Sequence, residues 1–454
     1  MKDFLTRLFR LRPGETGIVL VLGLVLLSNS VAVQVSGIAA ISNFLSEGGV
    51  NSILIIWLVD MLLITLMTGV QSLIIDRFDR VKLMQGMAVG FALVFTTLRL
   101  MFTFQAPGWL NYSLLYLVSD QQWLIFPLVF WILANDVFGM AQAKRLFPPI
   151  AGWGFVGKLL GIGIAAVSPD LFARLEIRPE ELLTFNVLIY LLVYLLMLGG
   201  LRKVKVRQTR QKRETVRETL TEGWDFVREV PSFRHLMLAI VALTLCDTII
   251  EFRFYVVSDV VFSDPGSYQR FLSLYRLGFT LSAFAVQSVL TSRIIDRVSL
   301  KNTFLILPFT VLAGATWMMA RPGIISGVGG MLLQKLPQHT VDESARKAFQ
   351  ALVPEERRGR VSIFMDSYMF AGGVIIGCLV TGAIVLVGLH WDIPDYFYVY
   401  LAVAALAALF AIWVIFKMRA VYDSSLLNWR LKRRQRATSV LDTGIFRALS
   451  DEES

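Results

Sequence analysis

The sequence predicts an all-α membrane protein with twelve spanning helices, arranged as two related halves of six. Composition is the first observation: 56% of the 454 residues are hydrophobic and only 17% are charged, whereas a soluble domain has about 25% charged residues. Lipid can accommodate so much apolar sequence and a soluble core cannot. The second and third observations are the alternation of charge between loops and a set of motifs that recurs in the same order in both halves.

Apolar runs long enough to cross a bilayer follow one another along most of the chain, because each spanning helix needs ~20 apolar residues. We expect spans near 17–41, 52–75, 83–104, 112–135, 149–168, 183–201, 234–257, 269–291, 301–320, 322–338, 361–388 and 396–417. The fifth and tenth runs are the least clear and both are rich in glycine. The first run is far too long for the apolar segment of a cleavable signal peptide, so it should remain as a helix.

The sequence contains no motif that indicates an enzyme, a metal site or a bound cofactor. Cys246 and Cys378 lie in apolar runs, and the three histidines are not at the spacing of metal ligands. The stretch Gly152–Lys158 resembles a phosphate-binding GxxxxGK loop, but Leu159 replaces the required Ser or Thr and no strand precedes it. Small residues at this spacing more often allow two helices to approach closely.

The loops between the runs alternate between strongly basic and nearly free of Lys and Arg. The basic segments are Lys2 to Arg12, Arg77 to Lys82, Lys144 and Arg145, Arg202 to Arg217, Arg293 to Lys301, Arg357 to Arg360, and Arg430 to Arg436. By the positive-inside rule both termini face the cytoplasm of an inner membrane. The net charge of +10 is therefore explained by the basic loops on the cytoplasmic side of the lipid bilayer, and we expect no nucleic-acid partner.

A polar segment between the sixth and seventh runs divides the chain. We expect an N-terminal six-helix half at 1–201, a basic cytoplasmic linker at 202–233, a C-terminal half at 234–417 and a polar cytoplasmic tail at 418–454. The linker contains an amphipathic pattern over 213–230, which is typical of a helix that lies on a membrane face.

Short motifs recur at equivalent places in the two halves. Asp76, Arg77 and Arg80 after the second span correspond to Asp296 and Arg297 after the eighth, while Lys144 and Arg145 correspond to Arg346 and Lys347. Such a six-plus-six duplication resembles the major facilitator transporters, whose charged loop after the second helix holds helix ends together in one state. These residues, with Arg358 and Arg360, are our candidates for a cytoplasmic gate or entry funnel. The alternative is that they are ordinary positive-inside anchors.

One stretch of the first half resembles a particular family. Within 123–163, Phe130-Trp131, Ala134-Asn135 and Ala143-Lys144-Arg145 are similar to the nucleotide transporters (ATP/ADP translocases) of plastids and intracellular bacteria, as are Glu355 to Arg360 in the second half. The resemblance implies nucleotide exchange. However, the chain has no base in 29–34, has Tyr255 where the family has a lysine, and has Gln121 where the family tends to have glutamate.

Ionisable residues inside the spans are costly in lipid and therefore usually face the protein interior. Asp60, Asp366 and eight others lie in the expected spans, and Asp247 and Glu251 share one helical face because they are four residues apart. The candidate substrate-binding residues are Arg99, Asp120, Asn135, Lys158, Asp247, Glu251, Arg253, Arg276 and Lys335. Arginine and lysine suit phosphate or carboxylate groups. The alternative is that these charges pair with each other and only fix helix packing.

We therefore expect a monomeric secondary transporter that uses alternating access to move a nucleotide or another small anion. Two alternatives stay open: a major facilitator transporter for an unrelated solute, and a membrane sensor or scaffold that no longer transports.

Overall fold

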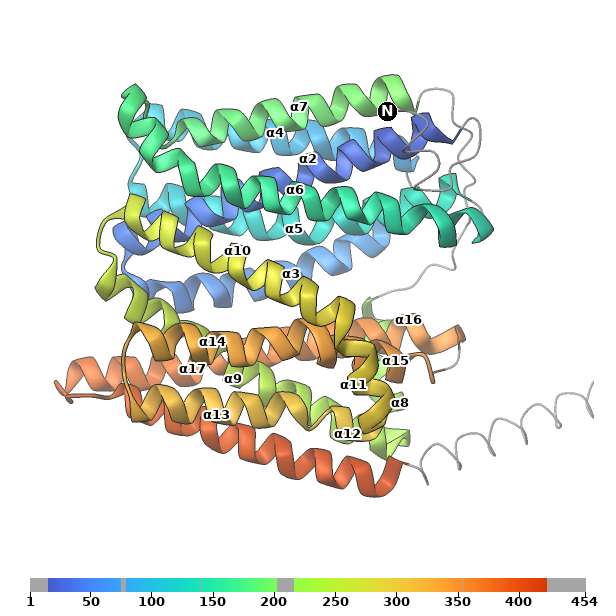
Figure 1. Ribbon diagram of the computed structural model, residues 1–454, viewed down its shortest axis with the longest axis vertical. Coiled ribbons are helices and arrows are strands. Elements are labelled where there is room, and N and C mark those ends of the chain that lie inside the picture. Colours follow the sequence, from blue (N-terminus) through green and yellow to red (C-terminus); the bar gives the residue numbers. More distant parts are fainter. Residues whose placement is uncertain (1–14, 75–78, 139, 202–215, 354, 423–454) are drawn as a thin grey trace, which may run out of the picture.

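The computed structural model describes residues 15–74, 79–138, 140–201, 216–353 and 355–422, which form a bundle of long helices with no strand in these ranges (Figure 1). The spanning segments are helices because lipid offers no hydrogen-bond partner to backbone N–H and C=O groups, so each segment must pair these groups internally.

The first half is built around one long buried helix. Its elements are α2 (Thr16–Gly48), η1 (Val50–Ser52), α3 (Ile53–Ile74), α4 (Arg80–Thr103), α5 (Gly108–Val137), α6 (Met140–Leu175) and α7 (Glu181–Gly200). Helix α2 packs against α5, α6 and α7, while α4 packs against α7 and α5. Glycines allow the closest of these contacts: a methyl group at Gly157 would collide with the backbone of Leu27, and one at Gly161 with that of Val31. The glycine-rich run therefore serves helix packing, and it lies within α6 rather than in a loop.

The second half begins after the helix α8 (Val216–Glu229). Its elements are α9 (Pro231–Val261), α10 (Pro265–Val289), α11 (Thr291–Val298), α12 (Leu300–Thr303), α13 (Ile306–Ala320), α14 (Ile324–Pro337), η2 (Gln338–Asp342), α15 (Glu343–Gln350), α16 (Glu355–Ile363), η3 (Phe364–Tyr368), α17 (Met369–His390) and a last helix, Phe397–Tyr422. Helix α9 packs against α17 and α14, and α13 packs against α14.

Ten helices of the described chain are long and apolar enough to cross a membrane, or eleven when α10 and α11 are taken as one span bent by 48°. The remaining expected span, at 322–338, corresponds to α14, which has only 14 residues. It continues into η2 and α15, where charged residues replace apolar ones. The π-helical turn of η2 joins α14 to α15. The resulting continuous helical segment is therefore apolar in its first part only.

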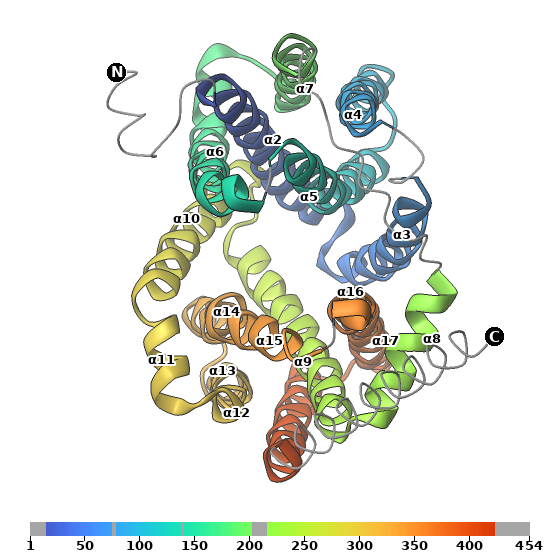
Figure 2. The ribbon, with the colours of Figure 1, turned by 90° about the vertical axis from the view of Figure 1, so that its right-hand side faces the viewer.

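The two halves meet along a few helices. Contacts join α10 to α6 and to α2, and α17 to α3. Figure 2, a view along the bundle, shows α2 and α4–α7 in one half and α9, α13, α14 and α17 in the other. We call the end where α4 and α6 begin and where α15 and α16 lie the basic end, since Arg80, Arg145, Arg346 and Arg358 lie there. Helix α8 also lies there and packs against α16 and α9, with Phe226 and Val227 buried.

Candidate functional site

A cavity of about 360 Å³ lies between the two halves. Helices α2, α3 and α5 of the first half and α9, α10, α14, η2 and α17 of the second provide its wall. The polar residues of the wall are Gln34, Asp60, Ser119, Asp120, Asp247, Thr248, Glu251, Arg276, Lys335 and His339. Five of the nine candidate substrate-binding residues are among them, and with Asp60 the acidic and basic side chains of five helices meet in one place.

Lys335 of α14 bridges the two carboxylates of α9. Its Nζ lies 2.7 Å from Oδ1 of Asp247 and 2.7 Å from Oε2 of Glu251. Gln334 donates to the same Oδ1, and Gln338 donates to Oδ2 over 3.4 Å. Asp247 is therefore well partnered, and the Lys335 ammonium is already engaged by two anions.

A second pair of carboxyl groups lies in the first half. Asp60 of α3 and Asp120 of α5 are within hydrogen-bonding reach of each other, and Oδ1 of Asp60 accepts a bond of 3.2 Å from the side-chain amide of Gln121. Asp60 is completely buried. Gln121 therefore supplies a hydrogen-bond donor to this buried carboxyl group.

Two further cations lie in this region: Arg276, which is part of the cavity wall and is close enough to Asp120 to be attracted by it, and Lys158, which is not part of the wall. Arg276 of α10 reaches across to α2, where a methyl group at Gly37 would lie 3.6 Å from Nη1 of the arginine. Lys158 of α6 is close enough to Arg276 for their positive charges to repel each other. Within the described ranges neither Arg276 nor Lys158 forms a hydrogen bond or an ion pair. Arginine and lysine side chains suit phosphate or carboxylate groups, so these two residues stay candidates for binding an anion.

Aromatic side chains separate the cavity from the end of the bundle opposite the basic end. Nε1 of Trp57 donates to Oη of Tyr116 over 2.9 Å, and the ring of Trp57 lies 6.0 Å from that of Tyr255 across the interface of the halves. All three are buried, whereas Trp123, deeper toward the basic end on α5, is 61% exposed. These rings can pack against a flat, ring-bearing solute.

The halves are also fastened together at that opposite end. Nη1 of Arg270 lies 3.0 Å from Oδ2 of Asp170, and Gln269 donates to Ser168 over 2.9 Å and to the carbonyl of Ala165 over 2.8 Å. These contacts join the start of α10 to the end of α6.

Four of the nine candidates are not part of the cavity wall: Lys158, described above, and Arg99, Asn135 and Arg253. Arg99 lies 2.5 Å from Glu181 at the start of α7, beside a separate groove formed by α6 and α7. Arg253 lies 3.8 Å above the ring of Phe397 in the last helix, because two residues of helix turn it about 200° away from Glu251. Asn135 is exposed and donates to the carbonyl of Trp131.

At the basic end of the first half, two candidate gate residues form ion pairs. Arg80 pairs with Asp136, and both side chains are buried. Arg145 lies 2.7 Å from Glu15, next to the start of α2. Neither acidic partner was among the candidates, since the sequence does not show which helices adjoin.

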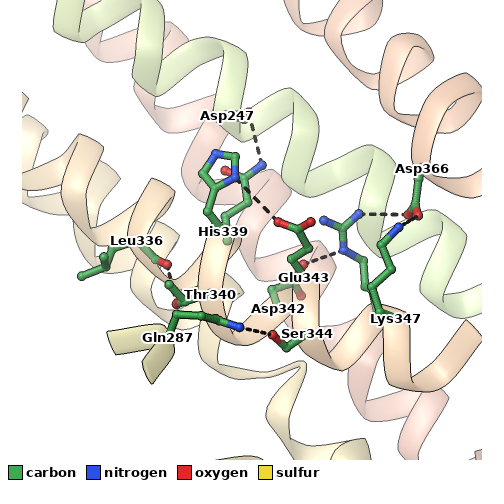
Figure 3. A network of polar contacts seen from close by, with 12 residues as sticks. Asp247, Gln287, Leu336, His339, Thr340, Asp342, Glu343, Ser344, Lys347 and Asp366 are labelled. Atoms are coloured by element: carbon green, nitrogen blue, oxygen red, sulfur yellow. Dashed lines mark hydrogen bonds and ion pairs between the residues drawn. The ribbon is translucent and has the colours of Figure 1, made fainter. Parts of the chain in front are cut away.

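In the second half, a network surrounds the two π-helical turns (Figure 3). Arg346 lies 2.9 Å from Asp342 of η2 and 3.3 Å from Asp366 of η3, and Lys347 lies 2.8 Å from Asp366. Gln350 and Ser362 also donate to Asp366. The pair Arg346 and Lys347 therefore fastens α15 to the segment before α17. The spacing of Asp342 and Arg346, four residues on a helix, is a signal that could have found this pair.

The remaining gate candidates differ in their surroundings. Arg360 pairs with Glu222 of α8, which also lies 3.2 Å from Arg357. Arg358 donates to the carbonyls of Val353 and Ala351. Asp296 and Arg297 are exposed and form no ion pair in the described part of the chain, and their role in a gate stays a prediction. Asp76 and Arg77 lie outside the described residues, as does the side chain of Lys144, and the expected equivalence of Asp76 with Asp296 therefore stays a prediction.

The fold, but not the sequence, is shared with solved transporters. No family model and no curated protein matches the chain. The nucleoside transporter NupG covers 89% of this chain and 98% of its own with a TM-score of 0.63 at 14% identity. A bacterial homologue of the iron transporter ferroportin, in an inward-facing state, has a TM-score of 0.59 at 16% identity over 90% of this chain and 100% of its own. The POT family transporter PepTSo has a TM-score of 0.60 at 10% identity over 88% and 98%. The chain thus has the all-α, major facilitator-type transporter fold.

Proposed function

We propose that this chain is a secondary transporter that moves a small organic anion by alternating access, and that the anion is a nucleotide or a nucleoside phosphate with fewer charges than ATP. The observation that carries the proposal is a pair of neighbouring cations that form no hydrogen bond or ion pair in the described chain, Arg276 in the wall of the central cavity and Lys158 close to it. Ionisable groups inside a membrane protein often mark a substrate pathway, so this pair is a candidate site for the anionic group of a solute.

The number of available cations argues for a modest charge on the solute. Lys335 is engaged by Asp247 and Glu251, and Arg253 stacks on Phe397 away from the cavity. Two free cations match a single phosphate group better than a triphosphate, because each unmatched buried charge would be left without a partner. The exchange of ATP for ADP, which the family resemblance implies, is therefore the less favoured form of this function.

The aromatic residues and the cavity size agree with a nucleoside moiety. The buried rings of Trp57, Tyr116 and Tyr255 line one side of a cavity of about 360 Å³, which is at the small end of the range for ligand pockets. We place the phosphate at Arg276 and Lys158 and the base against these rings.

The orientation belongs to the same proposal. We infer that the basic end faces the cytoplasm of an inner membrane, with both termini on that side, because Lys and Arg gather there. A reporter fused after Ser454 tests this, and a periplasmic signal from it would contradict the orientation.

Uptake into proteoliposomes tests the substrate. Radiolabelled UMP, uridine, ATP and inorganic phosphate are the probes, and we expect UMP uptake to exceed ATP uptake. Losing one charged partner costs about 2–5 kcal/mol, so Arg276→Gln should lower UMP affinity by about thirtyfold or more. Arg253→Gln is the matched control, because this interior arginine does not reach the cavity.

Two results would overturn the proposal. One is the absence of binding and uptake for every phosphorylated probe. The other is an equal loss of UMP affinity in Arg276→Gln and Arg253→Gln, which would mean that general damage rather than a lost contact explains the effect. Preference for ATP with strict exchange against ADP would instead favour the translocase reading.

A further inference from the structure

The carboxyl pair of Asp60 and Asp120 has a feature that ion pairing does not explain. Asp60 is completely buried, and while its Oδ1 accepts from Gln121, its Oδ2 finds no N–H or O–H donor among the described residues. The group that lies within hydrogen-bonding reach is another carboxyl, that of Asp120. Two acceptors facing each other form a bond only when a proton lies between them.

Two carboxyl groups this close, one of them completely buried and the other partly buried in the cavity wall, repel each other when both are ionised, so such a pair tends to share one proton. The other charged and titratable groups that face the pair are Tyr116 on α5, Glu251 and Tyr255 on α9, and Arg276 on α10, with Lys335 and His339 completing the cavity. Glu251 repels a second negative charge at the pair, whereas Arg276 attracts one. Lys335 is held by Asp247 and Glu251 and does not neutralise the pair.

The pair and the anion site are linked through Arg276. This arginine belongs to the second half, and Asp120, to which it is electrostatically attracted, belongs to the first. When the pair loses its proton, its added negative charge holds the guanidinium and opposes an incoming anion. When the pair is protonated, the attraction weakens and the guanidinium can bind the solute instead.

We propose that Asp60 and Asp120 together form the proton-binding site that couples transport, so that one proton enters with each anion and the chain is a proton–anion symporter. The symport claim rests on the proposed function, but the proton site does not. The step involves no covalent chemistry: a proton binds between the two carboxyl groups on one side of the membrane and leaves on the other.

Infrared spectroscopy of the purified full-length protein tests the proton site without any substrate. The wild type should show a carboxylic-acid carbonyl band near neutral pH that disappears as the pH rises. Asp60→Asn and Asp120→Asn should each remove this band, because the shared proton needs both groups. Both substitutions are close in shape to a protonated carboxyl and should fold. Asp392→Asn, at an exposed turn, is the control and should leave the band unchanged. A band that persists in both single variants, or that is missing from the wild type, overturns the site.

Transport of UMP in proteoliposomes tests the coupling. An inward proton gradient should drive UMP accumulation in the wild type, and the two Asn variants should lose this accumulation by about tenfold or more, equivalent to ~1.4 kcal/mol. They should still exchange internal for external UMP, since exchange needs no net proton movement. Gradient-driven accumulation in both variants would refute the coupling role. If the wild type moves no UMP, the proposed function fails, and the infrared band alone decides the proton site.

Discussion

The bridge formed by Lys335 gives a prediction whose size follows from the structure. Its ammonium lies 2.7 Å from a carboxylate oxygen of Asp247 and 2.7 Å from one of Glu251. With an effective dielectric constant of about 20, each contact contributes about 332/(20 × 2.7), or about 6 kcal/mol of gross attraction. Desolvation of the three groups offsets much of this, and removing one partner of a buried pair typically costs about 3–5 kcal/mol. We therefore expect Lys335→Met to lower the free energy of unfolding by about 3–5 kcal/mol.

Unfolding by denaturant in mixed micelles, followed by tryptophan fluorescence, measures this change. The triple variant Lys335→Met, Asp247→Asn, Glu251→Gln should recover more than half of the lost stability, because it leaves no uncompensated charge. Lys417→Met is the control: this exposed lysine lies 5.7 Å from the ring of Trp413 and should contribute less than about 1 kcal/mol. A single variant as stable as the wild type would show that the bridge is not a net electrostatic attraction. A triple variant as unstable as the single one would show that lost packing, not charge, is responsible.

Three further outcomes are expected. Gly157→Ala should destabilise the protein by about 1–3 kcal/mol, because its methyl group meets the backbone of Leu27. Gly163→Ala has open space around it and should not destabilise the protein. Equal melting temperatures of the two variants would contradict this expectation. In the double variant Asp170→Cys, Arg270→Cys, a disulfide should block UMP transport until it is reduced, because this contact joins the two halves at one end. Uninhibited transport by the fully oxidised variant would argue against alternating access. Glu222→Ala should speed amide hydrogen exchange in α8, because this residue pairs with two arginines of α16; unchanged exchange would mean that apolar packing alone holds α8.

Part of the candidate site could be predicted from the sequence because it depends on one helix at a time. Asp247 and Glu251 are four residues apart and do lie on one face, and their separation from Arg253 follows from the same periodicity. The contact of Arg253 with the ring of Phe397 could not be predicted, because it depends on the position of the last helix in the bundle. The pairing of Arg99 with Glu181 could not be predicted for the same reason, since Glu181 begins α7, which two other helices separate from α4 in the chain.

The sequence by itself determined that the chain is an all-helical membrane protein. Its apolar composition indicates that it lies in lipid, and in lipid a helix is one of the few structures that pairs every backbone N–H and C=O group. Its charge alternation and repeated motifs also indicated a major facilitator-type scaffold, which the solved structures share. Only the tertiary structure decided which buried charges meet. Asp60 faces Asp120, and Lys335 bridges Asp247 and Glu251, while Arg276 forms no hydrogen bond or ion pair in the described chain. The rotation and tilt of each helix set these pairings, and they arise from packing between segments far apart in the sequence, which no single span encodes.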